Sequence, residues 1–306
     1  RVKIMSTPIR IPVETRFPLD LAVSIAPIDD LYQDAKLDTW SPESDITWAA
    51  LDRKAFSPKQ LDAARYVWSR RAWLQYTGIT ETPALLLRFC LERSRAVDAK
   101  YFLTVRNTEE AMLVECFHDY AELLGGYVDR PADPRWEALI SRGYYRDALD
   151  AETSLDAYVA VHCAIESGLE LELFRAYSRN AREPVARSVL QRSERVKARH
   201  AKFGWQYLGK RMPELSEDER STIVRAANTW LMEVALSGYH VPSLSTSIDY
   251  GIEERAQTLA AESGLGAATP SQEQDIVRAY LSSARARFRD MGLRFTALRH
   301  PRLGEL

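Results

Sequence analysis

The sequence lacks an excess of charge of either sign and any long apolar run. Its 41 Lys and Arg residues balance 43 Asp and Glu residues, which excludes a dominant electrostatic attraction to nucleic acid or to an anionic membrane. No apolar stretch approaches the roughly 20 residues that a helix needs to cross a bilayer. The opening stretch RVKIMSTPIR also lacks the apolar centre of a secretory signal. We therefore expect neither a nucleic acid nor a membrane as a partner.

Cysteine is scarce as well. The three cysteines (Cys90, Cys116 and Cys163) are odd in number and far apart, and each falls within an apolar helical pattern. Such residues are typical of small buried thiols in a reducing compartment rather than of a disulfide framework. We therefore expect a cytoplasmic protein.

Strand-like alternation is also scarce, whereas helical periodicity is plentiful from Ser57 onward. Caps and apolar spacing predict helices at 57–78, 81–97, 107–126, 154–180, 183–212, 216–238 and 271–292. Long helices joined by short loops favour an all-α fold, a ferritin-like four-helix bundle with additional flanking helices. We expect one domain over residues 1–306, divided into an extended N-terminal arm (1–56), a bundle core (57–238) and a C-terminal wrap and helix (239–306). The segment 239–270 is expected to cover the surface.

Two near-equal spacings of acidic residues run through these predicted helices. Bundles that hold two metal ions use a Glu from each of two helices and Glu-x-x-His from each of the other two. The i, i+3 spacing puts Glu and His on one helix face, and divalent ions accept carboxylate oxygen and imidazole nitrogen. Glu81 is followed after 28 residues by Glu110, but position 113, where a histidine would stand, is Leu113.

The second copy is damaged at the other residue of the motif. Glu166 is followed after 30 residues by Lys197 in place of a glutamate, and then by His200 at the expected spacing. His162 lies one turn before Glu166, where it is either a hydrogen-bonded core histidine or an additional metal ligand. The candidate metal ligands are therefore Glu81, Glu110, Glu166, His200 and His162.

A second register of the first copy places an intact Glu-x-x-His at Glu115 and His118, with 33 residues between Glu81 and Glu115. Helical periodicity favours the first register, because the apolar positions of 107–126 share a face with Glu110. Glu115 and His118 fall on the opposite, polar side. Two other interpretations stay open, in which Glu110 and Glu81 are acids that stabilise helix N-termini.

The stretches RNTEEAMLVECF (106–117) and RVKARHAKFGW (195–205) resemble the two DEARH-type helices of ferritin-like di-iron oxygenases. The nearest families by this resemblance are p-aminobenzoate N-oxygenase-like and ribonucleotide-reductase-like proteins, over residues 30 to 240. The resemblance implies a homodimeric cytoplasmic bundle with O2-activating chemistry on amines or other small molecules. It also implies that Glu166 and His200 belong to the second metal and that Glu110 bridges to it.

Lys197 changes the charge of this predicted centre. It shares the inner helix face with His200, where a buried ammonium needs a carboxylate, so we expect it to bond Glu110, Glu166 or Glu81. An ion pair with Glu194 at the surface is the alternative. Three glutamates and one lysine leave a formal charge of −2, which matches one divalent ion, or none if carboxylates are protonated. We therefore expect one Fe or Mn ion or no metal at all, and not a two-metal centre.

Three functions fit these patterns. The first is an oxygenase or oxidase-type enzyme that acts on a small molecule, with Lys197, Glu110 and Glu166 as catalytic groups of a remade centre. The second is a non-catalytic homologue that serves as structural or regulatory subunit of an active di-iron protein. The third is an intact di-iron oxygenase that uses Glu115 and His118. Because the sequence lacks a dinucleotide or phosphate-loop fingerprint, any electrons are expected from a separate donor.

Overall fold

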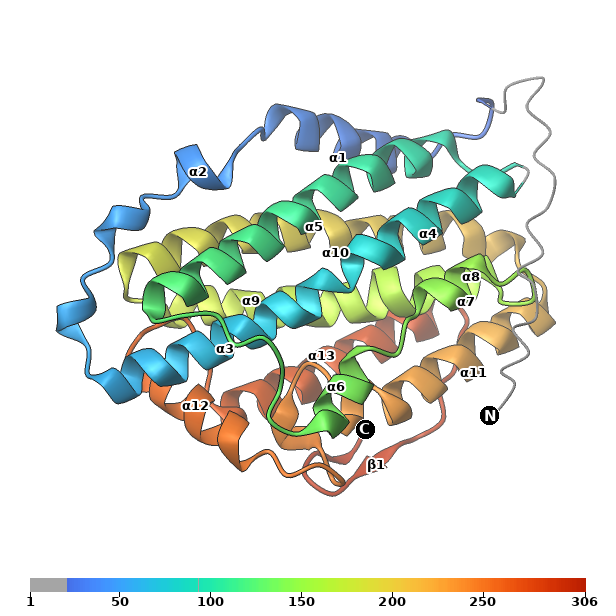
Figure 1. Cartoon of the computed structure of the whole chain (residues 1–306). Coiled ribbons are helices and arrows are strands. Elements are labelled where there is room, and N and C mark those ends of the chain that lie inside the picture. The colour runs from blue at the N-terminus through green and yellow to red at the C-terminus, as the bar shows by residue number, and fades with distance from the viewer. Residues whose placement is uncertain (1–20, 93) are drawn as a thin grey trace, which may run out of the picture.

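The computed structural model describes residues 21–92 and 94–306, and it is helical along most of that length (Figure 1). The expectation of an all-α fold is confirmed. Helices α3 and α4 pack on α5, α10 packs on α9 and on the turns that precede it, and α10 also contacts α5. These segments form the four-helix core: α3 (Pro58–Tyr76) with α4 (Gly78–Leu91), α5 (Val97–Leu124), η3 (Val159–Glu166) with α9 (Ser167–Asn180), and α10 (Pro184–Arg211).

Flanking helices cover the core on two sides. In Figure 1, α1 runs across α5 on one side, while α12 and α13 lie on the other, against α3 and α9 respectively. The larger flanking helices are α1 (Ala26–Leu37), α11 (Glu217–Glu233), α12 (Gly251–Glu262) and α13 (Pro270–Asp290). The shorter elements are α2 (Pro42–Asp45), α6 (Pro134–Ile140), α7 (Tyr145–Leu149), α8 (Leu155–Tyr158), the 3₁₀ turns η1 (Trp48–Ala50), η2 (Arg53–Ala55), η4 (Met212–Glu214), η5 (Ala235–Ser237) and η6 (Pro242–Leu244), and the antiparallel strands β1 (Arg299–His300) and β2 (Gly304–Glu305).

Helix starts follow their capping residues where the sequence carries a clear cap. The Ser57 side chain accepts from the backbone N–H of Gln60, the Gln60 side chain returns the interaction, and Pro58 occupies the first turn. The predicted start of α3 is therefore confirmed. In contrast, α5 begins at Val97 rather than near residue 107, so Glu110 lies in the middle of a long helix. The interpretation of Glu110 as an N-terminal helix acid is wrong.

Helices α3 and α4 are almost one helix, interrupted beside the predicted first ligand. Thr77 keeps right-handed helical angles between Tyr76 and Gly78. Pro83 has no N–H to bond the carbonyl of Ile79, which weakens this part of the helix. A Cβ on Gly78 would lie 2.7 Å from the carboxylate carbon of Glu110, so a larger residue at this position would displace that carboxylate.

The helix that carries Glu166 contains a π-helical segment that the sequence reading missed. Residues Val159–Glu166 form η3, between α8 and α9. Side-chain hydroxyl groups bond two carbonyl groups of these wider turns. Ser167 Oγ donates to His162 O at 2.9 Å, and Tyr280 Oη donates to Ala164 O at 3.0 Å. Inserted π turns are frequent at functional sites because they re-aim side chains within a helix.

The two ends of the chain differ from the expected arm and wrap. Residues 1–20 of the predicted N-terminal arm lie outside the described residues, and the rest is largely helical rather than extended, with Trp40 buried. The segment 239–270 is not a surface cover alone: it contains α12 and buries Tyr239, Val241 and Leu244. The division into one domain stays a prediction.

The expectations of buried cysteines and of no membrane-spanning helix can be compared with the structure. Cys116 and Cys163 are buried as expected, whereas Cys90 is exposed, because it lies on the outer face of α4 near its end. None of the helices in the described ranges combines the length and the apolar character that crossing a lipid bilayer requires.

Candidate functional site

Four carboxylates from four helical elements line one small cavity of about 40 Å³ in the bundle core. Glu81 comes from α4, Glu110 from α5, Glu166 from the end of η3 and Glu170 from α9. The duplicated spacing predicted the first three, and the structure brings them together. Glu170 was missed, although it lies one helical turn after Glu166 and therefore shares its face.

Lys197 is buried in this core, with 2% of its surface exposed. Its Nζ donates to Glu170 Oε1 at 2.8 Å. We expected Glu110, Glu166 or Glu81 as its partner, and that prediction is wrong. The acid is Glu170, which lies one helical turn after Glu166. The alternative of a surface pair with Glu194 is wrong too, because Lys197 points inward.

A second cation in the core, Arg106, was missed by the sequence reading. Its Nε donates to Glu110 Oε1 at 3.0 Å, and its Nη2 donates to Ser167 Oγ at 3.4 Å. Burial opposes the charged form, but nearby acidic groups, including Glu110, outweigh it and raise the pKa of Arg106. The available signal was its i, i+4 spacing from Glu110. We call Glu81, Glu110, Glu166, Glu170, Arg106 and Lys197 the carboxylate centre.

Glu166 is held between two histidines. His162 Nδ1 lies 2.7 Å from Glu166 Oε2, and His240 Nε2 lies 3.0 Å from Glu166 Oε1. Burial alone would raise the pKa of Glu166, but hydrogen bonds from both imidazoles outweigh it and bring the pKa to about 2. His162 therefore takes the core hydrogen-bonding role that we left open. His240 was not found because its segment was assigned to the surface.

His200 is fully buried but does not face this cavity. Its Nε2 lies 3.0 Å from Glu109 Oε2, a carboxylate that also accepts from Arg199. Burial, followed by the charges of Arg106 and Lys197, lowers the pKa of His200 well below its usual range, so the ring is neutral and donates to Glu109. The structure therefore separates His200 from Glu110 and Glu166, with which we expected it to converge.

The alternative ligands Glu115 and His118 do not lie beside Glu81 either. The His118 side chain is 45% exposed and lies 3.1 Å from Asp119 Oδ1. Glu115 is only partly buried, and neither residue lines the cavity that contains Glu81. The polar side of α5 faces outward, as the periodicity indicated.

The donor set of the carboxylate centre does not fit a pair of metal ions. Leu113 offers no donor, the ammonium of Lys197 occupies the remaining glutamate position, and His200 bonds elsewhere. Four carboxylates with two cationic side chains leave a formal charge of −2, so two divalent ions would add excess positive charge. Within residues 21–92 and 94–306, no group of three or more His, Cys, Asp or Glu side chains is arranged to hold a metal ion.

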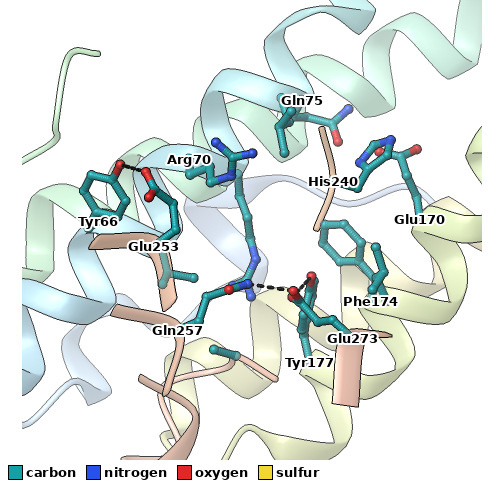
Figure 2. A pocket seen from close by; sticks show the side chains of 15 residues that line it. Tyr66, Arg70, Gln75, Glu170, Phe174, Tyr177, His240, Glu253, Gln257 and Glu273 are labelled. Atoms are coloured by element: carbon teal, nitrogen blue, oxygen red, sulfur yellow. Dashed lines mark hydrogen bonds between the residues drawn. The ribbon is translucent and has the colours of Figure 1, made fainter. Parts of the chain in front are cut away.

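A second cavity of about 50 Å³ adjoins the centre and shares Glu170 and His240 with it (Figure 2). Two adjacent arginines of α3 line it, each less than 10% exposed. Figure 2 shows Glu273 accepting from Tyr177 and Gln257, and Glu253 accepting from Tyr66. We call this set the arginine cluster: Tyr66, Arg70, Arg71, Tyr177, Glu253, Gln257 and Glu273.

Glu81 also faces an open cleft of about 440 Å³. The side chain is half-buried, and Thr77 joins it in lining both the cleft and the core cavity. Burial, with repulsion from Glu166 and Glu110, raises the pKa of Glu81 well above its usual range. Glu81 therefore connects the carboxylate centre to the surface.

The helical core and its converging carboxylates define an all-α, ferritin-like bundle of the R2 type. The similar solved structures include an R2-like ligand-binding oxidase with an aerobically reconstituted metal cofactor after photoconversion, at 18% identity and a TM-score of 0.68, covering 85% of this chain and 93% of that one. Another is an R2-like ligand-binding oxidase with an aerobically reconstituted Mn/Fe cofactor, at 17% identity and a TM-score of 0.68, covering 85% and 92%. No protein-family model and no curated protein sequence matches this chain. The likeness to these structures is one of fold.

Proposed function

We propose that the protein is an enzyme of the R2-like oxidase fold that acts on a small molecule at a centre in which side-chain cations replace metal ions. The observation that carries this proposal is the pair of buried contacts from Lys197 to Glu170 at 2.8 Å and from Arg106 to Glu110 at 3.0 Å. Buried carboxylates need compensating positive charge, and in this core two side chains supply it.

The reaction type that these residues support is proton transfer to or from a molecule in the open cleft. Glu81 is the group that the cleft and the core share, and its environment favours the protonated form. A positioned carboxylic acid with a raised pKa is suited to general acid–base catalysis near neutral pH. In this proposal the charges of Glu166 and Glu110 keep Glu81 protonated, and Lys197 pairs with Glu170 in the same cavity.

A single-metal centre is the second candidate. His162 and His240 flank Glu166, so two imidazoles and a carboxylate lie together, and a metal ion would have to replace the hydrogen bonds between them. Two histidines with one carboxylate are a recurring ligand set for Fe(II) in oxygenases. One divalent ion would also neutralise the formal charge of −2. Solved structures of the same fold are described with Mn/Fe cofactors, which favours Fe or Mn as that ion.

Metal analysis separates these candidates. The purified protein is incubated with Fe(II) or Mn(II) without oxygen, desalted and analysed for bound metal. We expect no stoichiometric metal, whereas one ion per chain would favour the single-metal candidate and two would overturn both. The matched control is the variant Leu113→His with Lys197→Glu and Arg106→Leu, which recreates the missing donors and should take up metal.

Catalysis is tested separately by incubating the metal-free protein in D2O with small amines and carbonyl compounds and detecting, by mass spectrometry, a deuterated product in which a carbon-bound hydrogen has exchanged for deuterium. We expect product formation by the parent and none by Glu81→Gln. If neither protein forms a product, the catalytic proposal is wrong and the role of a non-catalytic partner subunit is favoured.

A further inference from the structure

The open cleft beside Glu81 has the size of a ligand site. Its volume of about 440 Å³ lies within the range of roughly 300–1,000 Å³ that is usual for small-molecule pockets. The last turn of α3, the start of α4, the 127–131 loop and α6 with its following turn form its walls. The two neighbouring cavities, of about 40 and 50 Å³, hold only a few water molecules by comparison.

Four aromatic side chains line the cleft: Trp73, Tyr76, Tyr127 and Tyr145. The indole of Trp73 is fixed in place, because its Nε1 donates to the carbonyl oxygen of Val128 at 2.9 Å. Tyr76 is 61% exposed, an unusual degree for a large aromatic residue at the end of a core helix. Fixed and accessible aromatic faces attract either apolar groups or cations.

The charges of the cleft decide between these two. Asp129 and Glu137 contribute two carboxylates and Arg130 contributes one guanidinium, so the formal charge of the rim is −1, while Glu81 adds a carboxyl group whose environment favours the protonated form. Within the described ranges, neither Asp129 nor Glu137 forms an ion pair with a basic side chain. Other exposed acids, such as Asp62 and Asp275, pair with an arginine three residues later.

We propose that this cleft binds a small organic cation, an ammonium group carried on an apolar body. The aromatic side chains accept the ammonium and its apolar substituents, and the rim carboxylates of Asp129 and Glu137 supply the opposite charge. An anion of the same shape is opposed by the two rim carboxylates and favoured by one arginine. A neutral molecule gains the apolar contacts alone.

Four probes of one shape test this inference by calorimetric titration of the full chain: benzyltrimethylammonium, protonated benzylamine, benzyl alcohol and benzoate. We expect both cations to bind about 10-fold more tightly than benzyl alcohol, which corresponds to about 1.4 kcal/mol, and benzoate to bind most weakly. A tighter quaternary ammonium identifies the aromatic faces as the main contact, whereas a tighter benzylamine identifies hydrogen bonds to carboxylates. Equal binding of benzyl alcohol, or stronger binding of benzoate, would overturn the proposal.

Surface variants locate the effect. Asp129→Asn with Glu137→Gln should lower the affinity for both cations several-fold and leave benzyl alcohol unchanged. The matched control Glu217→Gln with Asp290→Asn removes the same charge at exposed positions that do not line the cleft, and should change nothing. An equal loss in both pairs would place the binding elsewhere and reject the inference.

This inference names the ligand class of the proposed enzyme, but it concerns binding alone. Cation binding without product formation would reject the catalytic proposal and leave the cleft assignment intact. Turnover of neutral molecules without any preference for cations would support the catalytic proposal and reject the assignment of the cleft to cations.

Discussion

The carboxylate centre and the arginine cluster adjoin each other, yet they bury charge in different ways. In the centre, Lys197 and Arg106 each donate directly to a carboxylate. In the arginine cluster, Arg70 donates to the backbone carbonyls of Gly238 and Tyr239 at 3.1 and 2.7 Å, and Arg71 to that of Gly266. None of the described carboxylates lies within ion-pair distance of either guanidinium.

The carboxylates of the two regions also have different partners. Glu273 accepts from a tyrosine and a glutamine rather than from a cation. The Arg71 guanidinium lies 4.6 and 4.2 Å from the ring centroids of Trp68 and Tyr177, so aromatic faces take the place of an anion. The comparison indicates that the centre depends on paired charges, whereas the cluster depends on neutral partners that tolerate the loss of one charge.

Removing the charge of Lys197 should have the largest effect. Lys197→Met leaves Glu170 without its cation in a core already rich in carboxylates, and we expect a loss of about 3 kcal/mol in unfolding free energy. Chemical denaturation measures it. The control Lys210→Met breaks an ion pair with Glu214 at the surface and should cost less than about 0.5 kcal/mol. Similar losses in both variants would show that Lys197 contributes no more than a surface lysine.

Removing a charge from the arginine cluster should cost less. Arg71→Met loses the bond to the Gly266 carbonyl and the contacts with two aromatic rings, but it strands no paired carboxylate and ends the burial of a guanidinium. We expect a loss of about 1–2 kcal/mol in the same denaturation experiment. A loss as large as that of Lys197→Met would remove the distinction between the two regions.

Glu273 of the arginine cluster and Glu166 of the carboxylate centre should contribute oppositely to the pH dependence of stability. Burial raises the pKa of Glu273 to about 7, although Tyr177 and Gln257 donate to it. A carboxyl whose folded pKa is raised binds its proton more tightly when folded, so stability falls as pH rises from about 4.5 through about 7. Stability measured between pH 5 and 8 should therefore decline more for the parent than for Glu273→Gln. Parallel pH curves would contradict the prediction.

The contribution of Glu166 to stability should change with pH in the opposite direction. Its folded pKa of about 2 lies below the ordinary value of 4.5, so its contribution is present above about pH 4.5 and is lost as pH falls towards 2. The parent should therefore lose more stability than Glu166→Gln on acidification below pH 4.5, as followed by circular dichroism. An equal acid sensitivity of the two proteins would mean that His162 and His240 do not hold the carboxylate as described.

The smallest effect on stability is expected from substitution of His118, which belongs to the alternative register of the metal motif. His118→Ala removes an exposed imidazole outside both regions, and the unfolding free energy should change by less than about 0.5 kcal/mol. Metal analysis of this variant should match that of the parent. A loss of bound metal on substitution would return Glu115 and His118 to consideration as ligands.

Helical class, cap positions and the convergence of Glu81, Glu110 and Glu166 could be read from the sequence, because each rests on local spacing. Periodicity places residues on a helix face, and four such faces meet in one core. Spacing also placed Lys197 in that core and His118 outside it. Which acid Lys197 reaches, in contrast, depends on the rotation and depth of two helices relative to each other.

Only the tertiary structure decided the remaining partners. His240 reaches Glu166 across 74 positions of sequence, from a segment whose composition suggested a surface loop. The π-helical turns shift the phase of residues 159–166, and His200 turns to Glu109 because an acid and an arginine already lie there. A hydrogen bond depends on distances of a few tenths of an ångström between separate elements, and a residue pattern carries no such information.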